Sequence, residues 1–524
     1  MRSIILFAVC LFFSRGLQAQ APVWSTDIAP ILYNNCASCH RPSGIAPFSL
    51  LTYSDASMFG GAIKTAVQNR HMPPWPPDPS YSRFAHERRL SQQEIDKIAD
   101  WVNGGQLPGD LSLAPPVPAF SNTGDLPGTP DLVAQIPTYT STASSGDIYQ
   151  CFVIPSGLNL PRYISAFEAV PGNRPLVHHV LVFSDTTGIC GQLDAASSGP
   201  GYTTFGGVGT GNAKLIGGWV PGSTPMQYPP GFGMRLPANA DIVIQIHYPA
   251  GTAGEQDSTK INFFFTPNNN VRGLVIEPAL NHMNAMTNGP LVIPANQTRT
   301  FNEHYEVPSF LNVSLLGLAP HMHLIGRNIT SFAVSPAGDT QKLIRINNWD
   351  FHWQGFYMFP KLKKIVGGTD LYATAFYDNT DNNPYNPNNP PQLITAGEGT
   401  SDEMMLIYFI YTLYQPGDEN IVIDSTVLAS AHPLPYYHDK QFLELYPNPA
   451  SGKVYLKCYL EQSSPIQVII TDMGGKLATA PFHSFLAKGY HALPIELPAL
   501  PAGTYQVQFS TLMRRETRKL VIGH

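Results

Sequence analysis

The stretch NVSLLGLAPHMHLIG (312–326) is mainly apolar, and near its end two histidines are separated by a single methionine. Side chains along a β-strand alternate between two faces, so His321 and His323 point to the same face if this segment is a strand. Two imidazoles on one face can bind one metal ion, and neutral imidazole suits copper and zinc. The segment therefore predicts a strand that ends in a pair of metal ligands.

The sequence from about 131 to 430 has the same character, with short apolar or alternating runs separated by Gly, Pro and Asn. This pattern is typical of β-strands joined by turns. Such runs are VHHVLVF (177–183), ADIVIQIHY (240–248), DLYATAFYD (370–378) and MMLIYFIYTLY (404–414). Because the stretch is long for one sandwich, we expect two tandem jelly-roll-like β-sandwich domains, at 131–275 and 276–430.

The composition agrees with a mainly β, multi-domain chain. Its 524 residues exceed the usual size of one domain, and its 44 glycines and 49 prolines suit many turns better than long helices. The net charge of −6 is mild, and no basic cluster is present to neutralise phosphates. We therefore expect no nucleic-acid partner.

The first residues, MRSIILFAVCLFFSRGLQAQ (1–20), combine an arginine, a short apolar run and a small-residue site near Ala19. The apolar run is too short to span a bilayer, so we expect a cleaved export signal at 1–19. No later stretch reaches membrane length, so we expect no transmembrane segment.

Residues 22–105 read as a small all-α domain. Its clearest helix begins where Ser91 and Glu94 form a capping-box pattern and ends at a pair of glycines. A Pro-, Gly- and Ser-rich linker follows at 106–130.

The segment NNCASCH (34–40) carries the C-x-x-C-H pattern that attaches a c-type haem. Cys36 and Cys39 would form thioethers with the haem, and His40 would bind the iron. We therefore expect one covalent haem c in this domain. The segment resembles the small cytochrome c-like domains that are fused to bacterial oxidoreductases.

The second iron ligand should come from the loop NRHMPPWPP (69–77), before the last predicted helix. Met72 is our choice, and a methionine ligand would raise the haem potential relative to a second histidine. His71 beside it and Met58 in the preceding predicted helix are the alternatives.

Other candidate ligands lie in the β region, namely His178, His179, His247, Met404 and Met405. In an ideal strand the adjacent His178 and His179 point to opposite faces, so both bind one metal only with a bulge or twist. A thioether ligand favours Cu(I). No HExxH motif or acidic cluster suggests a hydrolytic zinc site.

The order of these motifs resembles the copper type II, ascorbate-dependent monooxygenases, the family of peptidylglycine- and dopamine-hydroxylating enzymes. The resemblance covers about 131–430 and includes the paired histidines, the HY strand, the HxH strand and SDEM (401–404). Two more segments look like family segments, NWDFHWQGFY (348–357) and YDNTDNNPYNP (377–387). The resemblance implies two copper ions, one in each sandwich.

The resemblance also assigns the ligands of each copper ion. The electron-supplying copper would be bound by His178, His179 and His247. The other copper would be bound by His321, His323 and Met404, and would bind O2 and hydroxylate an aliphatic carbon of a small organic substrate. Met405 is the alternative by register, but SDEM favours Met404.

The sequence departs from the peptide-amidating members of the family at the substrate carboxylate clamp. Ala319 and Leu406 stand where those members have an arginine and an asparagine, while Tyr408 keeps the tyrosine of the clamp. Without the charged partner a bidentate grip on a carboxylate is lost. We therefore expect a more apolar pocket and no peptide amidation.

The fusion of two redox modules suggests that an external donor reduces the haem, which then reduces the three-histidine copper and through it the methionine copper. The alternative is a non-catalytic surface protein that binds copper or transfers electrons. Cys151 and Cys190 flank the paired histidines and could form a disulfide, which leaves Cys458 over.

Residues 442–524 resemble the C-terminal sorting domains of the type IX secretion system of Bacteroidota, on "LYPNPASGK", "MGGK" and "GTYQVQF". This resemblance implies a contact with the type IX secretion machinery. We therefore expect a protein that is exported through the periplasm and is secreted or held at the cell surface.

Overall fold

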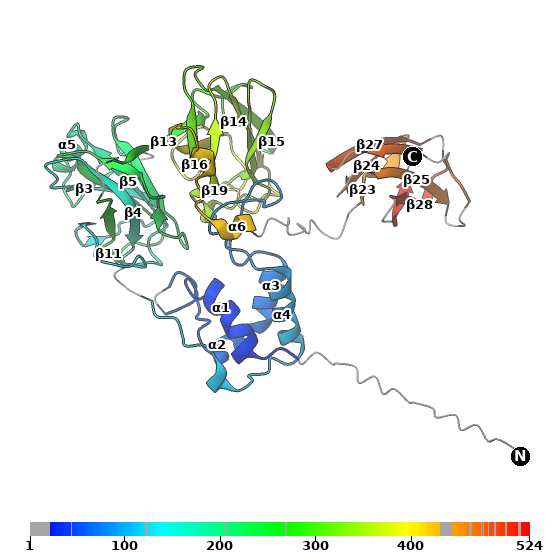
Figure 1. Cartoon of the computed structure of the whole chain (residues 1–524), viewed down its shortest axis with the longest axis horizontal. Coiled ribbons are helices and arrows are strands. Elements are labelled where there is room, and N and C mark those ends of the chain that lie inside the picture. Colours follow the sequence, from blue (N-terminus) through cyan, green and yellow to red (C-terminus); the bar gives the residue numbers. More distant parts are fainter. Residues whose placement is uncertain are drawn as a thin grey trace, which may run out of the picture. The chain divides into compact units, whose positions relative to one another are not determined.

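The computed structural model describes residues 21–429, apart from 43, 121–123, 205–206 and 268–269, and residues 443–523, apart from 461–463, 473, 475, 480–481, 487–488, 498–499 and 512–514. The predicted export signal lies outside the described residues. The chain divides into two compact units, 1–432 and 433–524 (Figure 1). No helix among the described residues has the length and apolar character that a membrane crossing requires.

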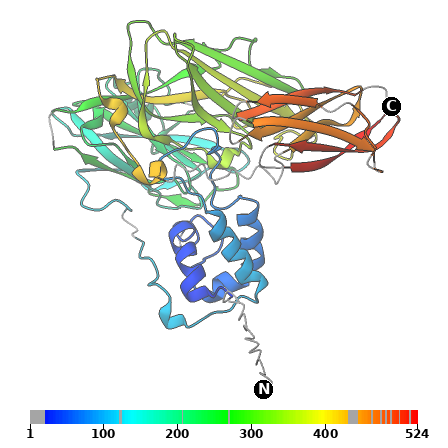
Figure 2. The ribbon, with the colours of Figure 1, turned by 45° about the vertical axis from the view of Figure 1, so that its right-hand side comes forward.

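The N-terminal part consists of helices that pack against one another (Figure 2). Ser91 caps the last one through the predicted capping box, because Glu94 N donates to Ser91 Oγ and Ser91 N donates to the Glu94 carboxylate. The fully buried core includes Ile28, Leu32, Ile98 and Trp101. The elements are η1 (Trp24–Ile28), α1 (Ala29–Asn35), α2 (Tyr53–Met58), α3 (Gly60–Gln68), α4 (Gln92–Asn103) and η2 (Leu111–Leu113).

The next part, the first sandwich, packs two sheets around one apolar core. One sheet has the order β6-β3-β10-β5-β7. Its strands are β3 (Ile148–Pro155), β5 (His179–Asp185), β6 (Tyr202–Thr203), β7 (Lys214–Trp219) and β10 (Asp241–Tyr248). Smaller elements are β2 (Tyr139–Thr140), which pairs with β11 (Gln256–Asp257), and the helix α5 (Ile189–Ala195).

The other sheet is shared with the following part of the chain. In the described residues its order is β1-β12-β4-β9-β13-β22-β16-β19, with β8 on the edge of β4. Its strands are β1 (Leu132–Gln135), β4 (Arg162–Val170), β8 (Met226–Gln227), β9 (Phe232–Leu236), β12 (Lys260–Phe265), β13 (Arg272–Asn281), β16 (Val313–His321), β19 (Tyr357–Ile365) and β22 (Leu406–Leu413).

Strand β13 joins the two parts. Its first residues pair in parallel with β9, and its later residues pair antiparallel with β22. The expected boundary between two sandwiches, at 275–276, falls inside this strand. The two parts are therefore linked by continuous backbone hydrogen bonding, which a flexible hinge between domains would lack.

The second sandwich packs β13, β22, β16 and β19 against a sheet of order β15-β20-β17-β18. That sheet consists of β15 (Gln297–Glu306), β17 (Gly326–Val334), β18 (Thr340–Ile346) and β20 (Asp370–Asn379). The remaining elements are β14 (Val292–Ile293), β21 (Ile394–Thr395), η3 (Phe351–Trp353), η4 (Asp418–Asn420) and α6 (Ser425–Ala429). The prediction of a mainly β chain is confirmed.

A docking loop, residues 75–88, leaves the helical part between α3 and α4 and packs on the second sandwich. Phe84 is fully buried in the core of that sandwich and stacks on Phe359, with ring centroids 5.3 Å apart. Arg345 Nε donates to Asp78 Oδ2 at 2.8 Å. The loop thus anchors the helical part by an apolar plug and an ion pair.

We expect Phe84→Ala to lower the free energy of unfolding by about 3–5 kcal/mol, as for other buried phenylalanines, because it leaves a cavity in the second sandwich. Thermal or urea unfolding would measure the change. Phe310→Ala is the matched control, since that ring is 85% exposed. Equal effects of the two substitutions would contradict the docking role of Phe84.

Glu303 on β15 is 1% exposed, and neither carboxylate oxygen has a hydrogen-bond partner among the described residues. Burial raises the pKa of its carboxyl to about 8. The folded state then retains a proton that the unfolded state loses above its ordinary pKa. The stability from this group is present below the unfolded pKa and is lost as the pH rises to about 8.

We therefore expect Glu303 to lower the free energy of unfolding by at most about 1.4 kcal/mol per pH unit over this window, and Glu303→Gln to remove this contribution. The slope that Glu403 adds over the same window, because burial also raises the pKa of its carboxyl to about 8, should remain. Urea unfolding at pH 5, 7 and 9 would measure the slope. Glu306→Gln, at the exposed end of the same strand, is the control. A slope in Glu303→Gln as steep as in the unchanged protein would show that Glu303 does not contribute to it.

The unit 433–524 contains a sheet of order β26-β25-β28-β29-β23-β24-β27 in its described residues. Cys458 is buried in its core. The strands are β23 (Leu443–Ser451), β24 (Lys453–Leu460), β25 (Ser464–Asp472), β26 (Phe482–Leu486), β27 (Gly489–Glu496), β28 (Gly503–Ser510) and β29 (Arg515–Ile522).

The expected disulfide between Cys151 and Cys190 is not formed, and both thiols are free and buried. Cys151 Sγ lies 3.4 Å from Thr204 Oγ1, while Cys190 Sγ donates to Val208 O at 3.6 Å. Each sulfur thus has its own polar partner within one small apolar cluster. Counting cysteines could not reveal these partners, so the prediction was wrong.

Candidate metal centres

Three histidines of the first sandwich direct the same ring nitrogen at one point. The Nδ1 atoms of His178 and His247 are 3.1 Å apart, those of His179 and His247 are 3.3 Å apart, and those of His178 and His179 are 3.4 Å apart. His179 pairs directly with His247 in the register of β5 and β10. His178 lies just before β5, so strand alternation does not force it to the opposite face.

Neutral rings are favoured at His178 and His179. Burial, followed by the neighbouring His247, lowers the pKa of His178 to about 3. Burial also lowers the pKa of His179 well below its usual value. Converging imidazole nitrogens without protons are the arrangement that a copper or zinc ion stabilises. The residues therefore fit a bound metal ion.

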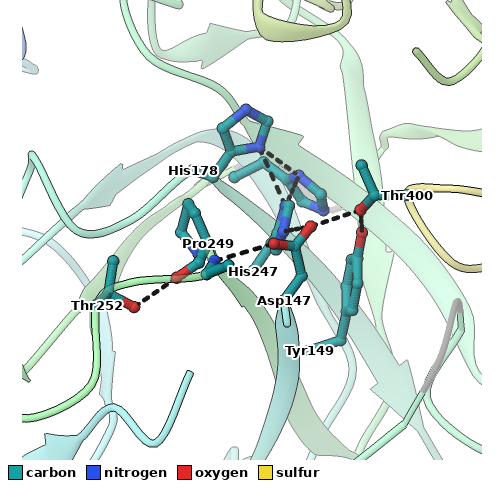
Figure 3. Close-up of polar contacts among 9 residues, drawn as sticks. Asp147, Tyr149, His178, His247, Pro249, Thr252 and Thr400 are labelled. Atoms are coloured by element: carbon teal, nitrogen blue, oxygen red, sulfur yellow. Dashed lines mark hydrogen bonds and ion pairs between the residues drawn. The ribbon is translucent and has the colours of Figure 1, made fainter. Parts of the chain in front are cut away.

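Residues of both sandwiches support His247 from its outer side (Figure 3). Its Nε2 lies 3.0 Å from Asp147 Oδ2, and the ring of Tyr149 stacks on it with centroids 4.4 Å apart. Asp147 also accepts hydrogen bonds from Thr400 Oγ1 at 2.6 Å and from Ala250 N at 2.9 Å. Burial raises the pKa of Asp147, but these polar contacts outweigh it and hold the pKa well below the ordinary value.

A second cluster lies at the end of β16. His321 Nδ1 donates to Gln354 Oε1 at 2.5 Å, and His323 Nδ1 donates to Asp402 O at 3.1 Å. The ring centroids of the two histidines are 5.0 Å apart. Burial lowers the pKa of His321 to about 4 and that of His323 to about 3. Because both Nδ1 atoms are engaged, the Nε2 atoms are the ones available to a metal.

Glu403 fixes the chain around this second cluster. Its Oε2 accepts from His323 N at 2.9 Å and from Met404 N at 3.1 Å, and its Oε1 accepts from Ile325 N at 2.9 Å. Tyr377 Oη donates to Met404 O at 2.8 Å. One buried carboxylate therefore holds the turn after His321 beside the backbone of Met404.

The two candidate methionines differ in their surroundings. Met405 is fully buried in the core of the second sandwich, and its backbone pairs with His282. Met404 is buried but is not among the residues of that core cluster. Leu406 starts β22 and pairs with His321. This arrangement favours Met404 over Met405 as the residue at the metal.

Phe351 of η3 lies between the two clusters. Its ring stacks on His178 with centroids 5.5 Å apart and meets His323 edge-on with centroids 5.8 Å apart. The two clusters therefore face each other across one aromatic side chain. The segment 348–357 resembles a family segment in sequence, but spacing alone did not indicate that it lies between the sites.

Two segments of the chain match known protein families. Residues 282–428 match the family "Copper type II ascorbate-dependent monooxygenase, C-terminal domain". The second sandwich thus carries a match to the C-terminal domain of this family. Residues 444–523 match "Secretion system C-terminal sorting domain", so the chain is exported to the cell surface or the medium.

Relatives with this monooxygenase domain include human "Putative DBH-like monooxygenase protein 2", 23% identical over 50% of this chain and 53% of its own. "Dopamine beta-hydroxylase" of Bos taurus is 23% identical over 50% of this chain and 43% of its own. The chain thus spans about half the length of these relatives. A solved structure of PNGF-II is 8% identical over 54% of this chain and 65% of its own, with a TM-score of 0.25.

The C-x-x-C-H segment forms a compact turn after α1, before the two sandwiches. Cys36 and Cys39 are free thiols, and His40 N donates to Cys36 O at 2.9 Å. His40 Nδ1 lies 3.2 Å from Phe48 O, which leaves Nε2 available to an iron. These residues fit a covalent haem.

The second iron ligand stays a prediction. Met72 follows α3, where its N bonds to Ala66 O, and its side chain is half-buried. His71 is exposed, and Met58 is 75% exposed.

The C-x-x-C-H turn lies where the helical part meets both sandwiches. A Cβ atom on Gly222, in the loop after β7, would lie 3.3 Å from Cys39 Sγ and 3.8 Å from Trp353 of η3. Arg88 of the docking loop donates to Gly222 O. A cavity of about 380 Å³ opens here and is lined in part by Arg88, Trp353 and Gln354. The same Gln354 binds His321.

Sequence reasoning missed Asp147, Thr400, Gln354, Phe351 and Asp402. Four of them contact a histidine that is distant in sequence, and Thr400 contacts Asp147, which lies beside His247. The available signal was the family-like sequence around Phe351, Gln354 and Asp402, which indicated no partner. These residues emerge from the register of the strands and from the docking of the two sandwiches.

Proposed function

We propose that this chain is an exported copper monooxygenase that hydroxylates an aliphatic carbon of a small organic substrate with O2, using electrons from its own c-type haem. The observation that supports it is the pair of histidine clusters that face each other across Phe351. One oxygen atom enters the C–H bond, and the other leaves as water after taking up two electrons and two protons. The two copper ions, when bound, supply these electrons one each.

The residues of the chain prepare both sites. His178, His179 and His247 present Nδ1 to one ion, and His321 and His323 present Nε2 to the other, with Met404 as the third ligand. Gln354 and Asp402 accept the Nδ1 protons of His321 and His323 and so fix the tautomer that leaves Nε2 free.

The surroundings of the second cluster favour a neutral, apolar substrate. Ala319 pairs directly with Tyr408, and Leu406 pairs with His321, so no cation stands at these positions. Burial raises the pKa of Tyr408 to about 12, which keeps its hydroxyl protonated as a hydrogen-bond donor. We propose that Tyr408 orients a hydroxyl or carbonyl group of the substrate.

The position of Cys39 supports the haem as internal electron source. Cys39, which would hold the haem, lies beside Gly222, and Gly222 in turn lies beside Trp353. The turn that contains Trp353 continues to Gln354 and thus to His321, and Phe351 of the same turn contacts His178. An external donor would reduce the haem from the side away from the sandwiches.

The test combines isotope labelling with electron counting. The copper- and haem-loaded protein is incubated with 18O2, a reductant and a panel of neutral alkyl and aryl-alkyl compounds. Mass spectrometry should find one 18O atom per product, with O2 consumption matching the product formed. Reoxidation of the haem and the copper without a product would instead favour the non-catalytic alternative, a surface protein that binds copper or transfers electrons.

A further inference from the structure

The tip of the loop before Met404 reaches across to the first sandwich. Residues 399–402 form a turn, which we call the Thr400 turn. Asp402 N donates to Gly399 O at 2.8 Å, and Gly399 N donates to Asp402 Oδ2 at 3.1 Å. Gly397 N donates to Glu403 O at 3.1 Å and closes the neck of the loop. These bonds fix the direction of the Thr400 side chain.

Thr400 contacts two residues of the first sandwich (Figure 3). Its Oγ1 donates to Asp147 Oδ2 at 2.6 Å and lies 3.1 Å from Tyr149 Oη. Tyr149 on β3 and Asp147 just before that strand both contact His247. A single hydroxyl therefore connects the loop of one metal site with the support of the other.

The connection continues to a metal ligand at both ends. Asp147 Oδ2 lies 3.0 Å from His247 Nε2. Two residues after Thr400, the carbonyl oxygen of Asp402 accepts from His323 Nδ1 at 3.1 Å. In both histidines the connected nitrogen is the one on the side of the ring away from the metal position.

We propose that Thr400 is a positioning residue that links the two metal sites, and that electrons pass between the sites along His247, Asp147, the Thr400 turn and His323. This inference rests on the proposed copper sites. The link contains only covalent bonds and short polar contacts, whereas the route through Phe351 crosses van der Waals gaps on both sides of the ring. One electron moves per transfer, from Cu(I) at one site to Cu(II) at the other, and no bond is broken.

Variants at Thr400 separate the link from simple packing. Thr400→Val keeps the shape but removes the hydroxyl, and Thr400→Ser keeps the hydroxyl. In the copper-loaded full chain, a sub-stoichiometric pulse of a one-electron reductant is followed by freeze-quench EPR of the Cu(II) signals. We expect Thr400→Val to slow equilibration between the sites about 10- to 100-fold and Thr400→Ser to restore most of the rate.

The copper content of Thr400→Val distinguishes a broken link from a loss of metal. The variant Phe351→Leu tests whether electrons pass through Phe351 instead. Copper content should stay unchanged in Thr400→Val, because no ligand is lost. Phe351→Leu should slow equilibration less than Thr400→Val does. An equal rate in wild type and Thr400→Val, an equal defect in the Val and Ser variants, or loss of copper in Thr400→Val would each overturn the link. Thr298→Val, an exposed threonine of the second sandwich, is the control.

The metal-free protein gives a readout that does not depend on the proposed function. Without the hydroxyl, the Thr400 turn loses its anchor on the first sandwich. Hydrogen exchange of the amides at 397–402 should therefore become about tenfold faster in Thr400→Val and not in Thr400→Ser. Unchanged exchange would overturn the anchor. A protein that shows these effects but hydroxylates no substrate would refute the proposed function and leave the link intact.

Discussion

Replacing His321 and His323 together by alanine should remove about one copper ion per chain and leave the other ion and the haem in place. The reason is geometric. Both imidazoles of the second cluster have Nδ1 occupied by Gln354 and Asp402, so their Nε2 atoms are the donors that this site offers beside a thioether. Metal analysis and a haem assay of the purified secreted protein would measure both contents.

His304→Ala is the control for this double variant. His304 lies in the same sandwich, but its Nε2 pairs with Asp370 at 2.7 Å on the surface. We expect no loss of copper there. Copper that stays unchanged in the double variant would refute the assignment of the second site. Haem without copper in the wild type would refute both copper sites and leave an electron-transfer protein.

Replacing Glu403 by alanine should lower both the stability of the protein and its affinity for copper at the second site. This fully buried carboxylate accepts backbone hydrogen bonds from His323, Ile325 and Met404. Its removal leaves buried N–H groups without partners, which costs at least about 3 kcal/mol of the free energy of unfolding. Because the same bonds hold the second cluster beside Met404, copper affinity at this site should also fall by about 10- to 100-fold.

Urea unfolding and copper titration would measure the two effects of Glu403→Ala. Glu398→Ala is the matched control, since Glu398 lies in the same loop and is exposed. A variant that is destabilised but retains normal copper affinity would show that Glu403 supports the fold without positioning the site. The losses of stability and of copper affinity in Glu403→Gln should lie between those of Glu403→Ala and those of Glu398→Ala. The glutamine keeps one acceptor oxygen, but its amide nitrogen cannot accept a backbone hydrogen bond.

The sequence alone determined the features that depend on local geometry. The capping box at Ser91 marked the start of α4. Period-two alternation predicted that His321 and His323 point to the same side, and their rings do lie together, although β16 ends at His321 and His323 follows it. The C-x-x-C-H motif identified a haem candidate by spacing. Each of these features involves residues within a few positions of one another, where the backbone conformation fixes their relation.

The tertiary structure decided the features that depend on contacts between distant residues. The pairing of His179 with His247 follows from the register of β5 and β10, and the thiols of Cys151 and Cys190 stay free because each has another partner. Phe84 leaves its own helical part to enter a core more than 200 residues away in sequence. No periodicity in the sequence encodes such contacts.

The difference between features set by local sequence and features set by tertiary contacts also applies to the candidate metal centres. The candidate ligands could be named from the sequence, because imidazole and thioether groups have a recognisable chemistry and their order resembles that of a known family. The residues around these candidates, Asp147, Thr400 and Gln354, are common polar residues, and their role depends on which distant side chains they contact. Only the docking of the two sandwiches through β13 and η3 brings them there, because a hydrogen bond requires a separation that sequence distance does not determine.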